Sequence, residues 1–319
     1  MSQLENDLVF VEKKRAIFNI GYTCNNNCRF CAIAKTREMV SDLTTEQIKS
    51  KIRQVREEGA EELIFSGGES SVRPDFVEIV DFSRRVGFSH IEITTNGRMF
   101  SYKKFCHDIV RAGLHYFRFS IHGPNTEIHD YLTRTQGSYD EALRGIDNIK
   151  AIAQDWRKWS VEPLYIEITT AIVKSNYQVL KDIVKLAVDM QVDQHNMNFV
   201  IPWGSAWIHK RGLIPKISDV IPYLFDAINY DKCHKRIVKK IANIPFCFMK
   251  GYEEYISEVA EGRIDIMNPQ GDPFDYQNHR RAKKCNMEAC KDCQRYHLCE
   301  GMYYEYIEIY GDSEFSAVK

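Results

Sequence analysis

Long hydrophobic runs, an excess of charge of one sign and a targeting segment are all missing from this sequence. Charged residues interrupt every apolar stretch well before the ~18 residues that a membrane-spanning helix needs. The 43 Lys and Arg residues are balanced by 44 Asp and Glu residues, so no overall positive field attracts nucleic acid. The opening MSQLENDLVFVEKKRAIF lacks the charged-then-apolar layout of a signal peptide. We therefore expect a cytoplasmic protein with no membrane association and no nucleic-acid partner.

Cysteine, by contrast, is abundant, and most of it is grouped. Ten cysteines in a reducing cytosol are not expected to form disulfides. Eight of them fall into two sequence groups, which indicates metal binding. The first group contains Cys24, Cys28 and Cys31, and the second contains Cys247, Cys285, Cys290, Cys293 and Cys299.

The first group places three thiols within eight residues, from Cys24 to Cys31. Thiolates are soft ligands that select iron–sulfur clusters, zinc or copper(I). A structural zinc site takes four protein ligands, usually as two pairs, and this group is one ligand short. A cubane [4Fe–4S] cluster held by three cysteines keeps one iron free for another ligand. The spacing by itself leaves a zinc knuckle, or cysteines without a metal, as alternatives.

About six β/α units follow one another along the chain. Helical patterns alternate with short strand-like runs, and Thr44 and Gln47 have the spacing of a capping box. This alternation predicts an α/β fold with a parallel sheet, and six units do not complete an eightfold barrel. The rhythm ends after about residue 203, which favours a domain boundary near 235–245. Strands are expected at 16–21, 62–65, 90–95, 116–121, 165–173 and 196–201.

The spacing Cys-x3-Cys-x-aromatic-Cys resembles the signature of the radical S-adenosylmethionine (SAM) superfamily. The resemblance implies a [4Fe–4S] cluster on the three cysteines of the first group, with SAM bound to its free iron. It also implies a partial (β/α)6 barrel, which we expect at 16–240 after an N-terminal lead-in at 1–15.

Gly67-Gly68-Glu69 follows the second expected strand and resembles the Gly-Gly-Glu motif of the same superfamily. In that motif, backbone groups and the carboxylate accept the amino group of SAM. The other interpretation of a glycine pair is a tight turn. Ser70-Ser71 stands where the family usually continues with Pro-Thr, so the rigidity of this loop is in question.

Further SAM-binding residues are implied by resemblance at the ends of later strands. Thr95-Asn96-Gly97 resembles a family motif, although Asn and Gly also favour turns. A Ser-x-x-Gly, His-Asp and Arg series matches related enzymes, and its Ser and Arg would meet the SAM carboxylate. One of the polar residues of the fifth strand is expected near the ribose, and an aromatic ring beside the last cysteine is expected near the adenine, unless it only packs the loop. Asn96 belongs to the first motif, and Ser120 and Arg134 are the Ser and Arg expected at the SAM carboxylate. Thr170 is the residue expected near the ribose, and Phe30 is the ring expected near the adenine.

The second cysteine group belongs to a small C-terminal domain that we expect at 241–319. Its pattern Cys-x2-Cys-x5-Cys resembles the auxiliary-cluster region of the SPASM and twitch radical SAM groups, with Tyr303 in place of the next cysteine. We predict one auxiliary [4Fe–4S] cluster, with Cys285 as a substitute ligand or a free thiol. Four thiolates also suit a tetrahedral zinc ion, which is the alternative metal. The predicted ligands are Cys247, Cys290, Cys293 and Cys299.

The resemblance implies an enzyme of the oxidoreductase type. A flavodoxin or ferredoxin would supply an electron, SAM would be cleaved to methionine and a 5′-deoxyadenosyl radical, and the radical would take a hydrogen atom from substrate. We expect a net oxidative modification of a peptide, as by a maturase, or of a small molecule. The alternatives are a small-molecule dehydrogenase of the twitch type, a reaction like that of the molybdenum-cofactor cyclase, and a non-catalytic iron–sulfur or zinc scaffold.

Overall fold

The computed structural model describes residues 15–156, 163–259, 264–267 and 274–319. The expected lead-in at 1–15 lies outside the described residues except for Arg15. In the ranges that are described, no helix combines the length and the apolar character needed to cross a bilayer.

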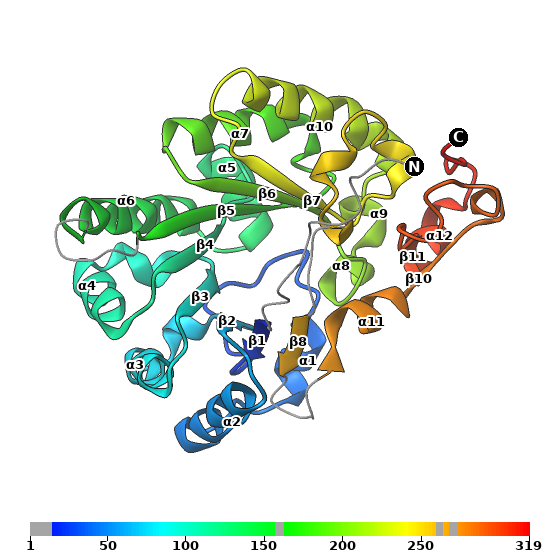
Figure 1. Cartoon of the computed structure of the whole chain (residues 1–319). Helices are drawn as coiled ribbons and strands as arrows, with labels where there is room; N and C mark the ends of the chain where they lie inside the picture. Colours follow the sequence, from blue (N-terminus) through cyan, green and yellow to red (C-terminus); the bar gives the residue numbers. More distant parts are fainter. Residues whose placement is uncertain (1–14, 157–162, 260–263, 268–273) are drawn as a thin grey trace, which may run out of the picture.

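Nine strands of the described chain form one sheet in the order β7-β6-β5-β4-β3-β2-β1-β8-β9. All neighbours are parallel except β8 and β9. Figure 1 shows the sheet curling into an open half-barrel, which confirms the predicted α/β partial barrel. The strands are β1 (Arg15–Asn19), β2 (Glu62–Ser66), β3 (His90–Thr95), β4 (Tyr116–Ser120), β5 (Tyr165–Ile172), β6 (Gln194–Phe199), β7 (Val238–Ala242), β8 (Ile264–Met267) and β9 (Phe274–Asp275).

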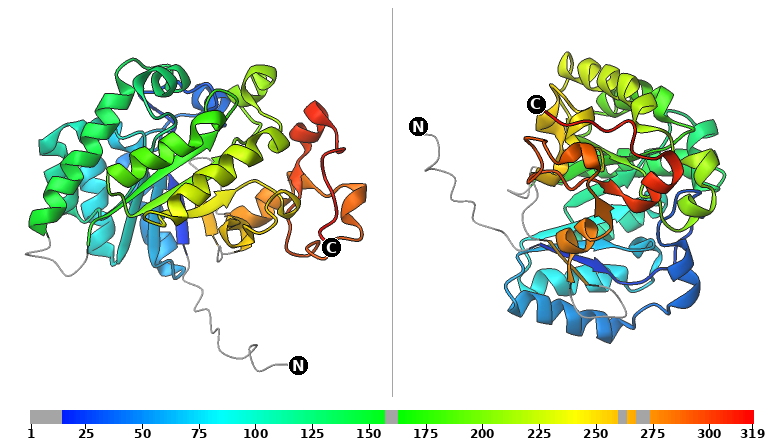
Figure 2. Two further views of the ribbon diagram at one scale, coloured as in Figure 1. Left: turned by 90° about the horizontal axis from the view of Figure 1, so that it is seen from above. Right: turned by 90° about the vertical axis from the view of Figure 1, so that its right-hand side faces the viewer.

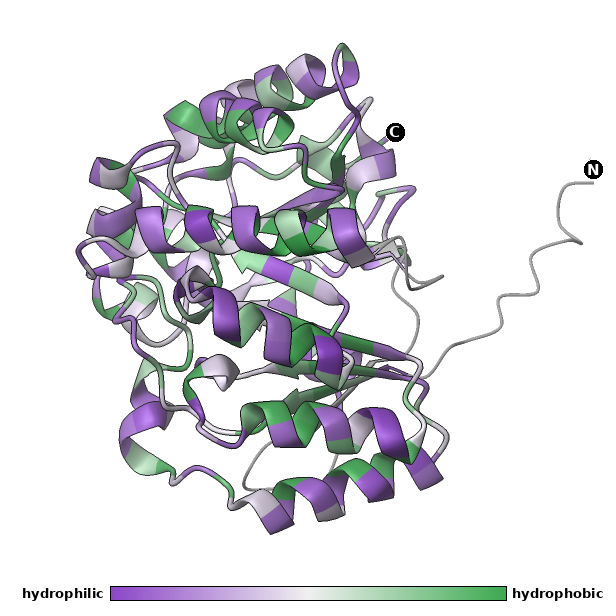
Figure 3. Ribbon diagram, turned by 90° about the vertical axis from the view of Figure 1, so that its left-hand side faces the viewer, coloured by the Kyte–Doolittle hydropathy of each residue, from purple (hydrophilic) through white to green (hydrophobic). Residues whose placement is uncertain are grey.

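The longer helices cover the outer face of the sheet (Figure 1). Buried helix residues such as Ile52, Val80 and Ile146 share one hydrophobic core with Phe18 and Phe117 of the strands. Along these helices the ribbon alternates between hydrophobic and hydrophilic stretches (Figure 3), as expected for elements with one buried side. They are α2 (Thr45–Glu57), α3 (Phe76–Val86), α4 (Lys103–Ala112), α6 (Ser138–Trp156), α7 (Leu180–Asp189) and α10 (Ile217–Lys232).

The predicted capping box is present at the start of α2. The side chain of Thr44 accepts a hydrogen bond from Gln47 N, and the side chain of Gln47 accepts one from Thr44 N. Shorter helices lie in the connections: α1 (Ala34–Met39), α5 (Thr126–Thr133), α8 (Ser205–Ile208) and α9 (Lys210–Leu213). Single 3₁₀ turns occur at Ser70–Val72, Arg98–Ser101, Tyr177–Val179, Phe246–Phe248, Glu253–Tyr255, Ser257–Val259 and Glu288–Cys290.

The sheet extends beyond the six predicted strands. The seventh, β7, was not foreseen because its sequence VKKIA places two lysines between apolar residues and shows no simple alternation. Its Val238 and Ile241 are nevertheless buried. Further along the chain, β8 pairs with β1 and β9 pairs with β8. The division at 240/241 stays a prediction, and segments on both sides of it contribute strands to one sheet.

The last part of the chain packs beside the open side of the barrel (Figure 2). It contains α11 (Tyr276–Arg281), a small antiparallel pair of β10 (Lys284–Cys285) and β11 (Met302–Tyr303), and α12 (Tyr304–Tyr310). Tyr303 and Tyr306 are fully buried, and the Tyr306 ring lies edge-on to Phe199 of β6. An aromatic contact therefore joins this segment to the sheet.

The inner face of the sheet, which points away from the outer helices, is polar. In β4 the residues alternate, so that Phe117 and Phe119 are buried on the helix side while Arg118 and Ser120 are only partly buried. Arg118 pairs with two buried carboxylates: its Nε lies 2.5 Å from Glu167 Oε1 and its Nη2 lies 2.8 Å from Glu92 Oε1. The second contact is an ion pair without hydrogen-bond alignment, because Glu92 Oε1 makes no hydrogen bond.

This arginine is predicted to hold the inner face together. The variant Arg118→Met leaves Glu92 and Glu167 buried without their shared cation, which should lower the free energy of unfolding by about 3–5 kcal/mol. Urea unfolding of the metal-free protein measures the loss. The control is Arg85→Met, which breaks the exposed Arg85–Asp81 pair and should cost at most about 1 kcal/mol. Equal stability losses in the two variants would contradict this role.

The same ion network makes stability depend on pH. Burial raises the pKa of Glu92, but Arg118 and His90 outweigh burial and hold that pKa below its ordinary value. The stabilisation from Glu92 is therefore present above the unfolded-state pKa and is lost as the pH falls through the lower folded-state pKa. The loss on acidification should be smaller in Arg118→Met than in the parent protein.

Candidate active site

The loop after β1 brings the first three cysteines together. Cys31 N donates to Cys28 O over 3.2 Å, which turns the chain between these two cysteines. Burial raises the pKa of the Cys28 thiol, and the neighbouring Cys24 and Cys31 raise it further. The charges of the three thiols thus influence one another.

Two arginines bind the backbone of this loop. Arg37 Nη1 donates to Asn26 O over 3.0 Å. Arg98, just after β3, donates from Nη1 to Asn25 O over 2.5 Å and is itself paired with Glu141 of α6. The loop conformation therefore depends on residues far away in the sequence.

The end of α5 also contacts the cysteine loop. Asn27 N donates to Thr133 O over 3.1 Å, and Arg29 N donates to Leu132 O over 2.8 Å. The next residue, Arg134, ends α5 with a left-handed backbone (φ 54°) and an exposed side chain. Arg134 is thus beside the cysteine loop, with its side chain exposed to solvent.

Gly67 and Gly68 allow the loop after β2 to touch the cysteine loop. Gly68 N donates to Gly21 O over 2.9 Å, and Glu69 N donates to Thr23 O over 2.8 Å. A Cβ atom on Gly68 would lie 2.3 Å from Thr23 O, and one on Gly67 would lie 2.5 Å from Gly21 O. No side chain fits at either position, so the contact between the two loops requires both glycines.

Glu69 is buried behind this contact and is held by its neighbours. Its Oε1 accepts from Ser71 Oγ at 2.5 Å and from Thr95 Oγ1 at 2.8 Å. Its Oε2 accepts from Asn96 N at 2.6 Å. Burial raises the pKa of Glu69, and these hydrogen bonds oppose the rise. Ser71 thus has a positioning role that the sequence analysis missed, although its place two residues after Glu69 was visible.

Asn96 links the carboxylate to the cysteine loop. Its side chain donates from Nδ2 to Asn25 Oδ1 over 2.7 Å and lies 3.8 Å from Cys24 Sγ. Gly97 follows with φ 81°, so the turn expected at this position is also real. Asn96 therefore stands at the turn and contacts both Glu69 and the cysteine loop.

The remaining predicted residues lie in different surroundings. Ser120 is partly buried at the inner-face end of β4. The Phe30 ring packs edge-on against His122, with ring centroids 4.6 Å apart. Thr170 is fully buried, and its hydroxyl donates to Ile121 O over 2.6 Å and lies 2.9 Å from His195 Nε2. The strand register instead places Thr169 beside Ser120, so alternation along β5 brings Thr169 to the inner face and turns Thr170 away from it.

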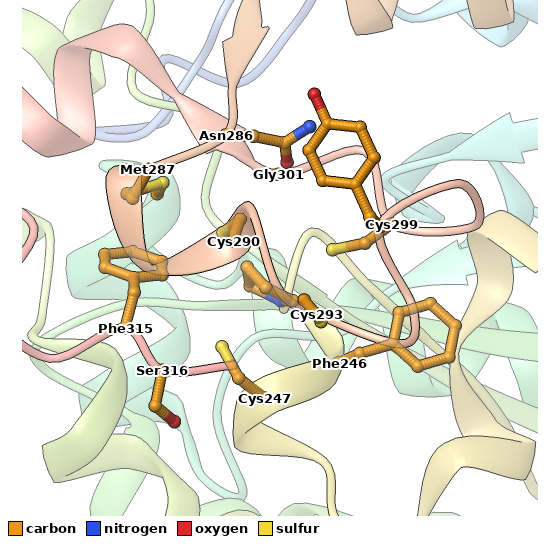
Figure 4. Close-up of a pocket in the computed structure, with 12 residues that line it drawn as sticks. Phe246, Cys247, Asn286, Met287, Cys290, Cys293, Cys299, Gly301, Phe315 and Ser316 are labelled. Atoms are coloured by element: carbon orange, nitrogen blue, oxygen red, sulfur yellow. The ribbon is translucent and has the colours of Figure 1, made fainter. Parts of the chain in front are cut away.

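A second group of thiols lines one pocket in the C-terminal segment. Figure 4 shows Cys247, Cys290, Cys293 and Cys299 around a common space. Burial raises the pKa of the Cys299 thiol, and hydrogen bonds from the backbone of Phe246 and Gly301 oppose that rise. Cys285 does not line the pocket, and its thiol points to Met302 O at 3.6 Å.

The donor atoms fit iron–sulfur groups at both places. The first loop offers three soft thiols and the buried Asn26 Nδ2, which has no hydrogen-bond partner in the described chain and suits a sulfide acceptor. The second pocket offers four thiols, and backbone N–H donors are already directed at three of them, Cys247, Cys293 and Cys299. Over the described ranges, no three His, Cys, Asp or Glu side chains converge on a position for a single metal ion. A cluster is larger than one ion and takes each cysteine on a separate iron.

Comparison with known families identifies the first part of the chain. The sequence profile of the Radical SAM superfamily matches residues 18–156. Residues 18–156 are thus similar to the radical SAM domain. The match includes the cysteine loop, Glu69, Asn96 and Arg134. Members of this superfamily are enzymes that use a [4Fe–4S] cluster and SAM.

Relatives of the radical SAM domain occur among proteins with different roles. An AdoMet-dependent heme synthase of Oleidesulfovibrio alaskensis is 26% identical over 58% of this chain and 45% of the relative. The chain spans about half the length of the curated heme synthases that it matches. Because the match covers only part of each protein, it shows that these parts are similar and does not establish the activity of the whole chain.

Solved structures share the fold over almost the whole chain. Streptococcus suis SuiB bound to S-adenosylmethionine superposes with a TM-score of 0.63, at 12% identity, over 96% of this chain and 76% of SuiB. The protein anSMEcpe, with AdoMet and the Cp18Cys peptide bound, superposes with a TM-score of 0.62, at 14% identity, over 92% of this chain and 89% of that protein. At such low identity these likenesses establish the fold.

The close approach at Gly68 can be tested by one methyl group. In Gly68→Ala the new Cβ would overlap Thr23 O, so the cysteine loop must move, at a cost of about 1–3 kcal/mol. We expect a lower melting temperature and less iron bound after anaerobic reconstitution. The matched control is Gly212→Ala, because a Cβ there meets no atom within 4 Å. Parent-like iron content and melting temperature in Gly68→Ala would contradict the steric argument.

Proposed function

We propose that this radical SAM protein takes a hydrogen atom from a peptide and leaves the peptide oxidised. The observation that carries the proposal is the contact between the three-cysteine loop and the buried Glu69, at the carboxyl ends of β1, β2 and β3. Catalytic groups of parallel α/β sheets gather at such strand ends. Here one hydrogen-bonded unit contains thiols, a carboxylate and the amide of Asn96.

The first cluster is proposed to be held by Cys24, Cys28 and Cys31. When bound, a [4Fe–4S] cluster with one open iron supplies the reductive cleavage of SAM to methionine and a 5′-deoxyadenosyl radical. Arg37 and Arg98 fix the loop backbone, so the thiols keep their positions when the cluster changes charge. A flavodoxin or ferredoxin is the proposed electron donor.

SAM is proposed to bind across the strand ends. Glu69 Oε2 accepts a single protein hydrogen bond, from Asn96 N, and keeps acceptor capacity for an ammonium group. Arg134 offers a planar guanidinium that suits a carboxylate. Gly67 and Gly68 present backbone groups, and Ser120 adds a hydroxyl on the inner face. Phe30 remains the candidate neighbour of the adenine.

The chemistry of the inner face favours a peptide substrate. On this face Arg118 is already paired with Glu92 and Glu167, so its guanidinium is not available to a ligand. Toward the strand ends the face carries hydroxyl and amide groups, such as Ser120, Thr169 and Asn198. Such groups suit the amides of a peptide. In support, the fold neighbours SuiB and anSMEcpe have both been solved with peptides, SuiA and Cp18Cys.

The second thiol group is proposed to hold one auxiliary [4Fe–4S] cluster. Cys247, Cys290, Cys293 and Cys299 would occupy all its irons, so its role would be to accept the electron that the substrate radical loses. Cys285, whose thiol is directed at a carbonyl oxygen, would stay free. Without this electron acceptor the reaction would not end in oxidation.

Other functions remain as alternatives to the peptide reaction. A twitch-type dehydrogenase acting on a small molecule would use the same two clusters. A reaction like that of the molybdenum-cofactor cyclase would also use SAM cleavage, with a nucleotide as substrate. A non-catalytic iron–sulfur or zinc scaffold would bind metal and produce no 5′-deoxyadenosine.

The cysteine loop provides the first test of this function. Changing Cys24, Cys28 and Cys31 together to Ala should remove about half of the iron, one of two clusters. It should also abolish formation of 5′-deoxyadenosine from SAM with dithionite under anaerobic conditions. Cys106→Ala is the control, because Cys106 is buried in α4 away from both thiol groups. Continued SAM cleavage by the triple variant would refute the proposal, and zinc in place of iron in the parent would favour a scaffold.

The carboxylate of Glu69 provides the second test. Glu69→Gln keeps the shape but removes the charge, which should weaken SAM binding by about 1.5–3 kcal/mol. This corresponds to a Kd higher by on the order of 10- to 100-fold, measurable by anaerobic equilibrium dialysis. Glu62→Gln is the control, since Glu62 lies at the opposite end of β2 and pairs with Arg15. An unchanged Kd in Glu69→Gln, with both clusters present, would show that SAM binds elsewhere.

A further inference from the structure

A short segment near the end of the given sequence lies against the pocket of Cys247, Cys290, Cys293 and Cys299, which we call the auxiliary pocket. Phe315 and Ser316 line the pocket, and Figure 4 shows Ser316 beside Cys247. Phe315 is buried between two aromatic neighbours, with ring centroids 5.3 Å from Phe248 and 6.2 Å from Tyr306. The aromatic contacts fix the segment at its first residue.

Backbone groups of this segment contact the thiols. Val318 N donates to Cys293 Sγ over 3.3 Å, and Gln294 N donates to Val318 O over 3.0 Å. Both backbone polar groups of Val318 are therefore hydrogen-bonded, its N–H to Cys293 and its C=O to Gln294. At the other wall of the pocket, burial raises the pKa of the Cys247 thiol to about 11, and a hydrogen bond from the Ser316 backbone opposes the rise.

Hydrogen bonds to sulfur have a known electrostatic consequence. The reduction potential of an iron–sulfur cluster depends on hydrogen bonds to its sulfurs and on its exposure to solvent. An N–H donor stabilises the reduced form more than the oxidised form, because the reduced form is more negative. Donors to thiolates therefore make a cluster easier to reduce. A segment that covers the site and keeps water out also slows the loss of the cluster from the protein.

We propose that residues 315–318 form a strap that closes the auxiliary cysteine site and raises its reduction potential through the N–H of Val318 on Cys293. The inference rests on the proposed auxiliary cluster and adds two positioning residues, Phe315 and Val318. Phe315 anchors the strap, and Val318 supplies the donor. Cys285 receives no donor from the strap, consistent with its place outside the pocket.

The N–H of Val318 can be removed by one substitution. Val318→Pro has no backbone donor, whereas Val318→Ala keeps the donor and loses only part of the side chain. The midpoint potential of the auxiliary cluster is measured by potentiometric titration with EPR detection, in the protein with both clusters reconstituted. We expect a lower potential in Val318→Pro and a parent-like potential in Val318→Ala. The same potential in the parent and both variants would overturn the proposal.

The anchoring role of Phe315 is tested separately. This second test also applies if Val318→Pro fails to assemble the auxiliary cluster. Phe315→Ala should speed the extraction of the auxiliary iron by a chelator severalfold, whereas Phe315→Leu should stay close to the parent. The cluster of the first loop serves as the internal reference and should be extracted at an unchanged rate. Parent-like extraction from Phe315→Ala would refute the strap.

The experiments distinguish a wrong auxiliary-cluster assignment from a wrong role of residues 315–318. If the parent protein holds only one cluster after reconstitution, the auxiliary-cluster assignment fails, and the strap proposal fails with it. If the second cluster is present and insensitive to all four variants, the strap alone is wrong and the proposed function is unaffected.

Discussion

The backbone contact between the cysteine loop and the loop after β2 is the constraint on which the site depends. Gly67 and Gly68 leave no room for a side chain, so Glu69 is carried directly behind the loop that holds the thiols. Once Glu69 is buried there, Ser71, Thr95 and Asn96 must satisfy its oxygens. The spacing of thiols, carboxylate and amide follows from this single close approach.

The curled sheet separates two kinds of surface. Its outer face is apolar and is covered by helices, so it supplies most of the hydrophobic stabilisation. Its inner face is polar, and Arg118 forms ion pairs with the two carboxylates buried there. Because the charges are paired with one another, the strand ends can present neutral groups to a substrate while the barrel stays stable.

The C-terminal segment is joined to the barrel by packing and by strands. Tyr306 contacts Phe199 of β6, while β8 continues the sheet beside β1. The pocket lined by the second group of thiols is therefore fixed relative to the first cysteine loop, as the proposed electron transfer from substrate to a second cluster would require. Phe315 lines the same pocket, and Val318 N donates a hydrogen bond to Cys293 Sγ.

Local patterns in the sequence determined much of this protein. The bounds of β3, the capping box of α2 and the two cysteine groups follow from periodicity, capping chemistry and ligand type, which involve neighbours along the chain. Tertiary structure alone decided that β7 joins the sheet, that Thr169 rather than Thr170 faces inward, and that Thr95 and Asn96 hold Glu69. These features depend on strand register and on contacts between distant segments. Spacing along one chain does not encode either, because a shift of one residue moves a side chain to the opposite face.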